Sequence, residues 1–339
     1  MAPVNTAAYL VEAQKPLELK EAPYPVPAPN EIVISNRAIA INPVDYATQL
    51  LGTNIFPWLK FPTIIGHDVA GEVVAVGSAV GNFKAGDRVV GLTPSAFQAY
   101  PTLPAYTASH IPDSITYERA SVIPLGFVTA GVGLFRKDYL GLQHPSVNAT
   151  PTGKTLLIWA ASTSVGSCAV QLAVSAGYEV ITTASPKNFA YAKNLGASHV
   201  FDYRSPTVQE DIIAAFNGKE SAGILAISGV DAESRAFVGG ACLHIAEKIG
   251  GNKFVAFAAP PPETLPNGVG AKFIMSLDPL KDEVSANVLF RDYLTGALAA
   301  GKFRPAPDPE VVGEGLESIQ GAMDTLQKGV SAKKLVVRI

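Results

Sequence analysis

The sequence predicts an α/β protein with a β-rich first part and a later part in which helices are wound around a parallel sheet. Three observations lead to this prediction. Short apolar runs are separated by Gly and Pro before about Ile123, and strand-like runs alternate with helix-like runs after it. The third is the length of 339 residues, 48% of them hydrophobic, which is sufficient for two domains with separate cores.

The first part contains short runs that are apolar or alternate in polarity, as strands do. Prolines at 23, 25, 27 and 29 and the Gly86-Asp87 pair interrupt these runs, as is typical of turns. Many short strands joined by such turns favour a compact, barrel-like β domain. The expected strands are Ala7–Val11, Glu31–Ala40, Ala70–Val76 and Arg88–Gly91.

The later part alternates apolar strands with helical patterns, which is typical of a parallel sheet. Near the end, Asn287–Ala300 and Gly313–Gln327 are expected to form amphipathic helices. The final run, Lys334–Ile339, is expected to be a strand that returns to the first domain. The expected strands of the parallel sheet are Leu156–Ala160, Glu179–Thr183, His199–Phe201, Gly223–Ile227 and Phe254–Ala258.

The composition argues against several classes of protein. Lys and Arg number 26 against 29 Asp and Glu, without a charged block, so no nucleic acid or anionic membrane partner is indicated. The most apolar stretch, Thr155–Ala184, contains many polar residues and is better explained as strand, helix and strand than as a membrane span. Only two cysteines occur. We therefore expect a cytoplasmic protein in a reducing compartment.

The segment from Lys154 to Gly166 is the clearest local signal of function. An apolar strand leads into a turn of small residues and then into a helix, which is the opening of a βαβ unit. Free N–H groups at such a helix start bind the pyrophosphate of a dinucleotide. Ala160 and Thr163 replace two fingerprint glycines, so a turn that binds nothing stays an alternative. The candidate cofactor-binding residues here are Ser162, Thr163, Ser164, Val165 and Gly166.

The end of the next expected strand indicates which dinucleotide is bound. NAD-binding units carry an acid there for the ribose 2′-hydroxyl, whereas this chain has Ser185, Lys187 and Asn188. A hydroxyl and an ammonium can bind a 2′-phosphate, which an acid would repel. Together with Tyr203, these residues predict NADPH as the cofactor. The alternative is that Lys187 is only a solvated lysine at a helix start.

These residues, taken with others, resemble the medium-chain dehydrogenase/reductase superfamily, and in particular its zinc-free quinone oxidoreductase-like branch. The closest similarity is to fungal trans-acting enoyl reductases and their relatives. The resemblance implies a GroES-like β-rich catalytic domain, residues 1–124 and 286–339, around a Rossmann NADPH-binding domain, residues 125–285. The segments that carry it are Asn42–Asp45, Gly66–Val73, Phe83–Val89, Thr129–Gly131, Ser185–Asn188, Phe201–Arg204 and Lys334–Val337.

The resemblance also implies that no metal is bound. Zinc-dependent relatives use a cysteine near Asn42, the histidine that matches His67 and a cysteine near Leu125. Only His67 has a side chain that binds zinc, and one ligand of three is insufficient for a catalytic site. We expect His67 and Asp45 to support the site.

Without zinc the chain lacks a strong Lewis acid. Reduction of an electron-poor alkene depends less on such an acid than the oxidation of an alcohol or the reduction of a ketone does. The predicted catalytic residues are Asn42 and Tyr46, near the substrate carbonyl, and Thr129, near the nicotinamide or its ribose. Tyr46 or water would deliver the final proton, although Tyr46 could equally be a packed aromatic. Phe257 and Lys334 complete the set of cofactor-binding candidates.

The predicted function is NADPH-dependent reduction of activated C=C bonds in an enone, enal or enoyl thioester. A quinone oxidoreductase or a carbonyl reductase is an alternative, and so is an NADPH-binding structural or sensor protein with little turnover. The expected partner is a small-molecule substrate, with a carrier-bound thioester as one candidate. The chain is expected to be a monomer or homodimer.

Overall fold

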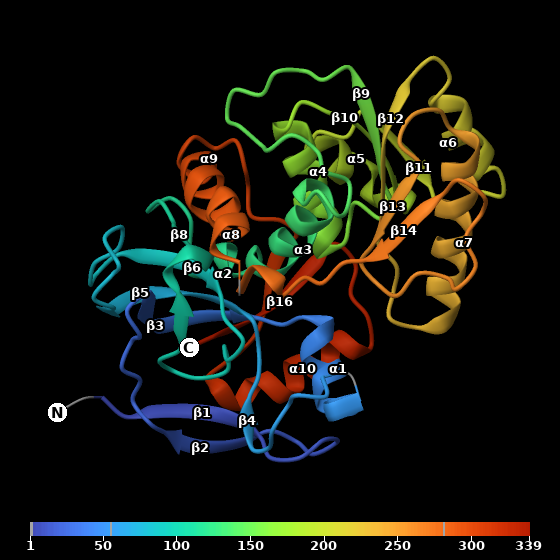
Figure 1. Ribbon diagram of the computed structural model, residues 1–339. Coiled ribbons are helices and arrows are strands. Elements are labelled where there is room, and N and C mark those ends of the chain that lie inside the picture. Colours follow the sequence, from blue (N-terminus) through green and yellow to red (C-terminus); the bar gives the residue numbers. More distant parts are fainter. Residues whose placement is uncertain (1–2, 55, 281) are drawn as a thin grey trace. The chain divides into compact units, whose positions relative to one another are not determined.

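A computed structural model describes residues 3–54, 56–280 and 282–339 of the chain (Figure 1). The chain divides into two compact units. The first unit comprises Met1–Leu125 and Leu280–Ile339, and the second comprises Gly126–Pro279. Each unit has its own sheets and hydrophobic core.

The first unit is built on two sheets. A three-stranded antiparallel sheet has the order β2-β1-β4, and a larger sheet has the order β15-β16-β3-β5-β6-β8, with β7 paired to β3. The strands are β1 (Asn5–Leu10), β2 (Glu18–Ala22), β3 (Glu31–Ala40), β4 (Thr63–Ile64), β5 (Asp68–Val76), β6 (Arg88–Leu92), β7 (Thr102–Pro104), β8 (Ala108–His110), β15 (Asp308–Glu314) and β16 (Lys333–Arg338).

The core of the first unit explains why these runs form strands. Ile32, Ile34 and Ile39 of β3 pack with Val69 and Val73 of β5, and all five side chains are buried. β-branched residues favour the extended backbone and pack well on a pleated surface. The four strands expected in this part of the chain are confirmed as β1, β3, β5 and β6, with boundaries shifted by up to two residues.

The last strand joins the first unit, as expected. β16 lies antiparallel to β3, with Val336 opposite Ala40 and Val337 opposite Ile39. This pairing brings Lys334, near the start of β16, to the end of β3 that leads into helix α1 (Pro43–Leu51).

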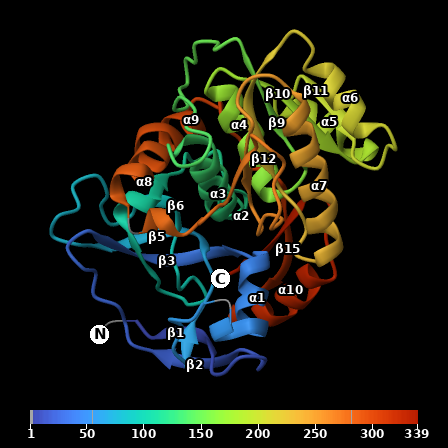
Figure 2. The same cartoon turned by 45° about the vertical axis from the view of Figure 1, so that its right-hand side comes forward.

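The short helices of the first unit cover its sheets. Figures 1 and 2 show α1 beside α10 (Ile319–Gln327), and the Gln49 amide nitrogen donates to Gln320 Oε1 at 2.8 Å.

The predicted helix at Asn287–Ala300 is confirmed as α8 (Glu283–Leu289), the π-helical turn η5 (Phe290–Leu294) and α9 (Thr295–Ala299). The remaining elements are η1 (Gly52–Asn54), η2 (Ala105–Thr107), α2 (Tyr117–Ser121) and η6 (Leu316–Ser318), and η4 (Asp278–Leu280) spans the sequence boundary between the two units.

The predicted helix at Gly313–Gln327 is wrong in its first third. Gly313 and Glu314 belong to β15, which pairs in parallel with β16. Gly315 then turns the chain with a positive φ of 76°, which favours glycine. The hydroxyl of Ser318 donates to the Glu314 carbonyl at 2.6 Å, and the helix begins only at Ile319. Strand pairing therefore overrode the helical periodicity.

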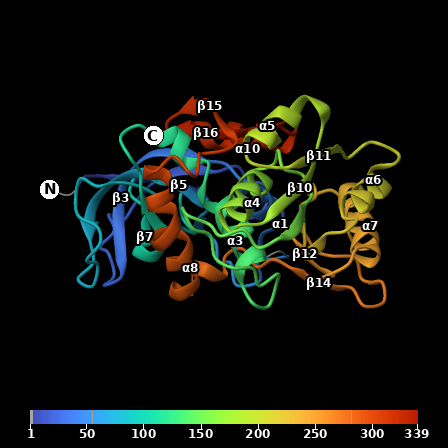
Figure 3. The ribbon, with the colours of Figure 1, turned by 90° about the horizontal axis from the view of Figure 1, so that it is seen from above.

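The second unit contains a six-stranded parallel sheet with the order β11-β10-β9-β12-β13-β14. Figure 3 shows α4 and α5 on one face of this sheet and α6 and α7 on the other. All five predicted strands are confirmed, whereas β14 was not predicted. The elements are α3 (Pro124–Phe135), β9 (Lys154–Ile158), α4 (Ser164–Ser175), β10 (Glu179–Ala184), η3 (Pro186–Asn188), α5 (Phe189–Asn194), β11 (His199–Asp202), α6 (Val208–Ala215), β12 (Glu220–Ala226), α7 (Ala232–Lys248), β13 (Phe254–Phe257) and β14 (Gly270–Phe273).

The order of these strands shows where a ligand would bind. β10 lies on one side of β9 and β12 on the other, so the winding reverses at β9. Open α/β sheets bind ligands at the carboxyl ends of strands beside such a reversal. The loop that follows β9 lies at that place.

One helical stretch, Tyr117–Phe135, is long and apolar enough to cross a membrane by length and composition. Of its most apolar window, 89% is buried within the structure, as in the core helix of a soluble protein.

Candidate functional site

The loop after β9 has the tight turn that dinucleotide binding requires. Ala160 has a positive φ of 73°, and its N–H donates to Thr183 Oγ1 at 2.9 Å. The N–H of Ala161 donates to the Thr183 carbonyl at 3.0 Å, so the neighbouring strand β10 fixes the turn. A Cβ at position 166 would lie 2.1 Å from the Ala160 carbonyl oxygen. Only glycine therefore allows the helix to start this close to the loop.

The start of α4 presents donors that have no partner among the residues that the structure describes. Thr163 caps the helix, because its Oγ1 accepts from the N–H of Gly166 at 3.0 Å. No hydrogen bond within the described residues engages the N–H groups of Ser164 and Val165. The Ser164 hydroxyl oxygen is also buried without a partner. Unused N–H groups at a helix start form an anion site, so this loop fits a pyrophosphate.

The residues predicted to read the 2′-phosphate lie at the ends of two adjacent strands. β10 and β11 are parallel, with Ala184 opposite Asp202, so Ser185 and Tyr203 follow neighbouring strand ends. Ser185 Oγ accepts from the Asn188 amide at 3.2 Å. Lys187 is exposed. The structure thus places the four predicted residues at one corner of the sheet.

Arg204 adds a second positive charge at this corner, and the sequence did not identify it as a candidate. Its guanidinium lies 5.4 Å from the centre of the Tyr203 ring and pairs with Asp202 at 3.5 Å. The signal that could have found it is its position directly after Tyr203.

Two further candidates of the second unit are buried, the predicted cofactor residue Phe257 and the predicted catalytic residue Thr129. Phe257 ends β13 and packs in the core cluster with Trp159, and its carbonyl accepts from the N–H of Ile274 at 2.8 Å. Thr129 lies one turn after Leu125 on α3 and is buried. Their contacts with a cofactor stay predictions.

The first unit contains a buried polar network that begins at α1. The N–H of Asn42, the residue before the helix, donates to Asp45 Oδ2 at 2.8 Å. The other oxygen of Asp45 bonds His67 Nδ1 at 2.9 Å. Asp45 is fully buried and His67 nearly so. Both residues are thus held in a fixed arrangement.

Asn42 connects this pair to Asp68 and Lys334. Its amide nitrogen donates to Asp68 Oδ2 at 2.9 Å, and its amide oxygen accepts from the Lys334 ammonium. The ammonium also lies 3.1 Å from Asp68 Oδ2. The second oxygen of Asp68 accepts from the N–H of Leu125 at 2.7 Å. The network therefore joins α1, β5, β16 and the start of α3.

This arrangement bears on two predicted residues. Asn42 uses both ends of its amide inside the network, and Lys334 directs its ammonium to Asn42 and Asp68. The structure thus brings together one predicted catalytic residue and one predicted cofactor residue. Their contacts with substrate and cofactor stay predictions. Asp68 was not identified as a site residue from the sequence. It follows Gly66-His67 directly, and an acid at this position could have been examined for a buried partner.

Tyr46 lies on α1, directly after Asp45. It is half-buried and packs against the core of the first unit. Burial raises the pKa of its hydroxyl above the ordinary value. Because the neutral phenol is favoured, Tyr46 remains a hydrogen-bond donor at neutral pH.

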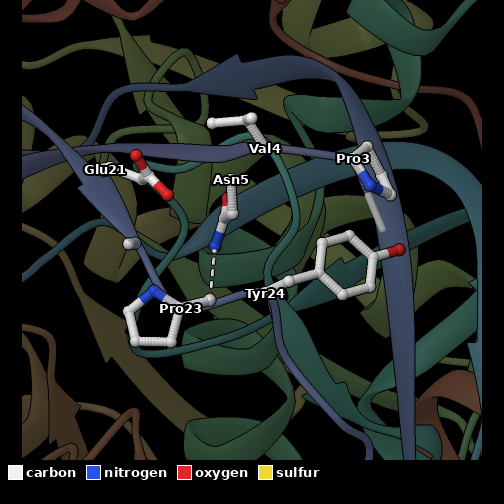
Figure 4. A pocket seen from close by; sticks show the side chains of 7 residues that line it. Pro3, Val4, Asn5, Glu21, Pro23 and Tyr24 are labelled. Carbon is white, nitrogen blue, oxygen red and sulfur yellow. Dashed lines mark hydrogen bonds between the residues drawn. The ribbon is translucent and has the colours of Figure 1, made fainter. Parts of the chain in front are cut away.

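A separate surface pocket of about 480 Å³ lies beside β1 and β2 and contains none of the predicted residues (Figure 4). Asn5 projects into it, but its amide already donates to the Pro23 carbonyl at 3.1 Å and to Gln98 Oε1 at 3.0 Å. We assign no role to this pocket.

Comparison with known proteins identifies the family. Residues 28–113 match the alcohol dehydrogenase GroES-like domain, and residues 164–249 match a family described as zinc-binding dehydrogenase. Dehydrogenase azaJ of Aspergillus niger is 50% identical over 346 aligned residues, which cover 99% of each chain. The chain belongs to the medium-chain dehydrogenase/reductase superfamily. It is therefore an oxidoreductase with a GroES-like domain and a Rossmann domain, and members of this superfamily bind a nicotinamide cofactor.

Other similarities extend over most of the chain. Trans-enoyl reductase himH of Aspergillus japonicus is 38% identical over 319 aligned residues, which cover 91% of this chain and 90% of that protein. The solved structure of mycobacterial Rv1454c complexed with NADPH has a TM-score of 0.73 and 24% identity, with 99% of this chain and 100% of that chain covered. The predicted resemblance to fungal trans-enoyl reductases is confirmed.

Zinc does not fit the residues of this medium-chain reductase. The side chain of Leu125 has no ligand atom, and the Asn42 amide is bonded to Asp68 and Lys334. In the part of the chain that the structure describes, no group of three or more His, Cys, Asp or Glu side chains could hold a metal ion. The donor set thus differs from that of a catalytic zinc site.

Proposed function

We propose that this medium-chain reductase reduces activated C=C bonds with NADPH as the cofactor. Enones, enals and enoyl thioesters are the candidate substrates. The observation that carries the proposal is the corner of the sheet formed by Ser185, Lys187 and Tyr203. No acid ends β10 there, and the Lys187 ammonium is exposed.

The 2′-phosphate of NADPH would be held at this corner. Ser185 and the ammonium of Lys187 donate charge-assisted hydrogen bonds to it, and the Arg204 guanidinium adds positive charge. The N–H groups of Ser164 and Val165 would hold the pyrophosphate. The solved structure of mycobacterial Rv1454c, which has a similar fold, is complexed with NADPH, which supports this choice of cofactor.

When bound, the reduced nicotinamide supplies a hydride to the β carbon of the substrate's double bond. The electron pair of that bond moves onto the carbonyl oxygen as an enolate forms. Tyr46 donates a hydrogen bond to this oxygen, which is the stabilisation that an oxyanion requires. Tyr46 or water then supplies the proton. Thr129 would contact the nicotinamide or its ribose, and Asn42, with Asp45 and His67, would hold the start of α1.

The relatives support alkene reduction over carbonyl reduction. Three curated relatives at 32–38% identity are named trans-enoyl reductases, whereas the relatives at 50% identity are named only dehydrogenases. The candidate substrates therefore include a carrier-bound enoyl thioester as well as free enones.

Oxidation of NADPH with a panel of enones, enoyl thioesters and quinones tests this proposal. Products made with deuterium-labelled NADPH would then be examined by NMR. We expect deuterium at the β carbon of a saturated ketone or thioester. Deuterium on a carbinol carbon would identify a carbonyl reductase, and turnover of quinones alone would identify a quinone reductase. NADPH binding without turnover of any compound would favour a structural or sensor role.

A further inference from the structure

The first turn of α3 packs directly against the start of α4. A Cβ at position 126 would lie 2.5 Å from Ser164 Oγ and 3.0 Å from the carbonyl carbon and oxygen of Ser164. A Cβ essentially never lies as close as 2.5 Å to another heavy atom, and a contact of 3.0 Å with the backbone is tighter than most. A side chain at position 126 would therefore displace the Ser164 hydroxyl and press against the Ser164 carbonyl.

Ser164 is the residue whose displacement matters for binding. It is the first residue of α4, its N–H has no partner within the described residues, and its hydroxyl oxygen is buried without a partner. The N–H of Ser164 is one of the two donors that the proposed function assigns to the pyrophosphate. The packing at Gly126 thus sets the position of the anion site.

The other side of this turn is fixed by Asp68. The Asp68 carboxylate accepts from the N–H of Leu125 at 2.7 Å, and a negative charge at a helix start is stabilising. Asp68 is itself held by Lys334 and Asn42. The residue next to Gly126 is therefore hydrogen-bonded to a buried network.

We propose that Gly126 is a positioning residue for the cofactor loop. Its missing side chain lets the turn fixed by Asp68 contact Ser164 without displacing the unused donors of α4. The inference rests on the proposed function, because the ligand whose affinity it controls is the pyrophosphate of NADPH.

Gly126→Ala tests the inference. The dissociation constant for NADPH would be measured by fluorescence titration, alongside the NADPH KM, kcat and unfolding temperature. We expect NADPH binding about tenfold weaker and a higher KM, with kcat at saturating NADPH within about twofold of wild type. Gly240→Ala on α7 is the matched control, because a Cβ there meets nothing within 4 Å. It should bind NADPH as wild type does.

A double variant separates this role from a general loss of structure. In Gly126→Ala/Ser164→Ala the hydroxyl that lies 2.5 Å from the new Cβ is gone. The loss of affinity in the double variant should therefore be smaller than the product of the two single losses. If Gly126→Ala does not fold, the double variant should fold and carry the measurement.

Three outcomes would overturn the inference. They are wild-type NADPH affinity in Gly126→Ala, independent effects of the two changes, and a double variant that stays unfolded. Absence of NADPH binding by the wild-type protein would instead refute the proposed function, and the inference with it. The wild-type titration thus distinguishes the two failures.

Discussion

The ammonium of Lys334 lies 3.1 Å from the carboxylate of Asp68, with 4% and 0% of the two side chains exposed. Lys334 is near the end of the chain and Asp68 begins β5, so the pair joins distant parts of the first unit. Removal of one partner from a buried pair leaves an uncompensated charge, which is strongly destabilising.

We therefore expect Lys334→Met to lower the free energy of unfolding by about 3–5 kcal/mol. Asp68→Asn should have a loss of similar size, and Asp68→Asn/Lys334→Met should lose less than the sum, because neither charge is left alone. Urea denaturation would measure all three variants. Additive losses would show that the two groups do not interact. Weaker NADPH binding at unchanged stability in Lys334→Met would favour a direct role with the cofactor.

Lys187 should determine the choice between NADPH and NADH. A hydrogen bond to a charged group contributes about 1.5–3 kcal/mol, so Lys187→Ala should weaken NADPH binding by at least about tenfold. NADH lacks the 2′-phosphate and should bind almost as it does to wild type. Lys193→Ala, which removes an exposed lysine from α5, is the control and should change neither affinity. Equal losses for both cofactors would mean that Lys187 does not contact the phosphate.

Tyr46→Phe should lower turnover by about tenfold or more, while NADPH affinity stays near wild type. The reason is the loss of one donor to the enolate oxygen. Because burial raises the pKa of Tyr46, the hydroxyl stays neutral through pH 7–9 and this difference should be constant there. Tyr24→Phe, in the surface pocket, is the control. A kinetically silent Tyr46→Phe with deuterium still at the β carbon would leave water or another residue as the donor.

Purified protein should contain far less than one zinc per chain. At the three positions where zinc-dependent relatives have ligands, this chain has Asn42, His67 and Leu125, of which only His67 suits zinc. Elemental analysis before and after incubation with zinc would measure the content. Stoichiometric zinc together with activity that a chelator abolishes would contradict this prediction.

The sequence was sufficient to predict the two architectures and the strand, turn and helix that begin at β9, because these depend on local pattern. An apolar strand, small residues and Gly166 determine the turn after β9 through contacts within a few residues. The residues that follow β10 could also be judged from the sequence, because the absence of an acid after Ala184 does not depend on distant contacts.

Features that depend on contacts between distant residues could not be predicted. Gly313 and Glu314, the last two residues of β15, were predicted to be helical because their pairing with β16 is not visible in the local periodicity. Gly126 lies 38 positions before Ser164, and nothing in the sequence indicates that they touch. The bond from Lys334 to Asn42 spans 292 positions, so the sequence could suggest each residue for the site but not their contact.

The pairing of β16 with β3 has a consequence for biosynthesis. The sheet of the first unit is completed only when residues 333–338 reach β3, whereas all of the second unit, Gly126–Pro279, leaves the ribosome earlier. The Rossmann unit can therefore fold during translation, while the β-rich unit that encloses it in sequence must wait for its last strand. Until then residues 38–40 of β3, which pair with β16, present an unpaired apolar edge that can associate with other chains.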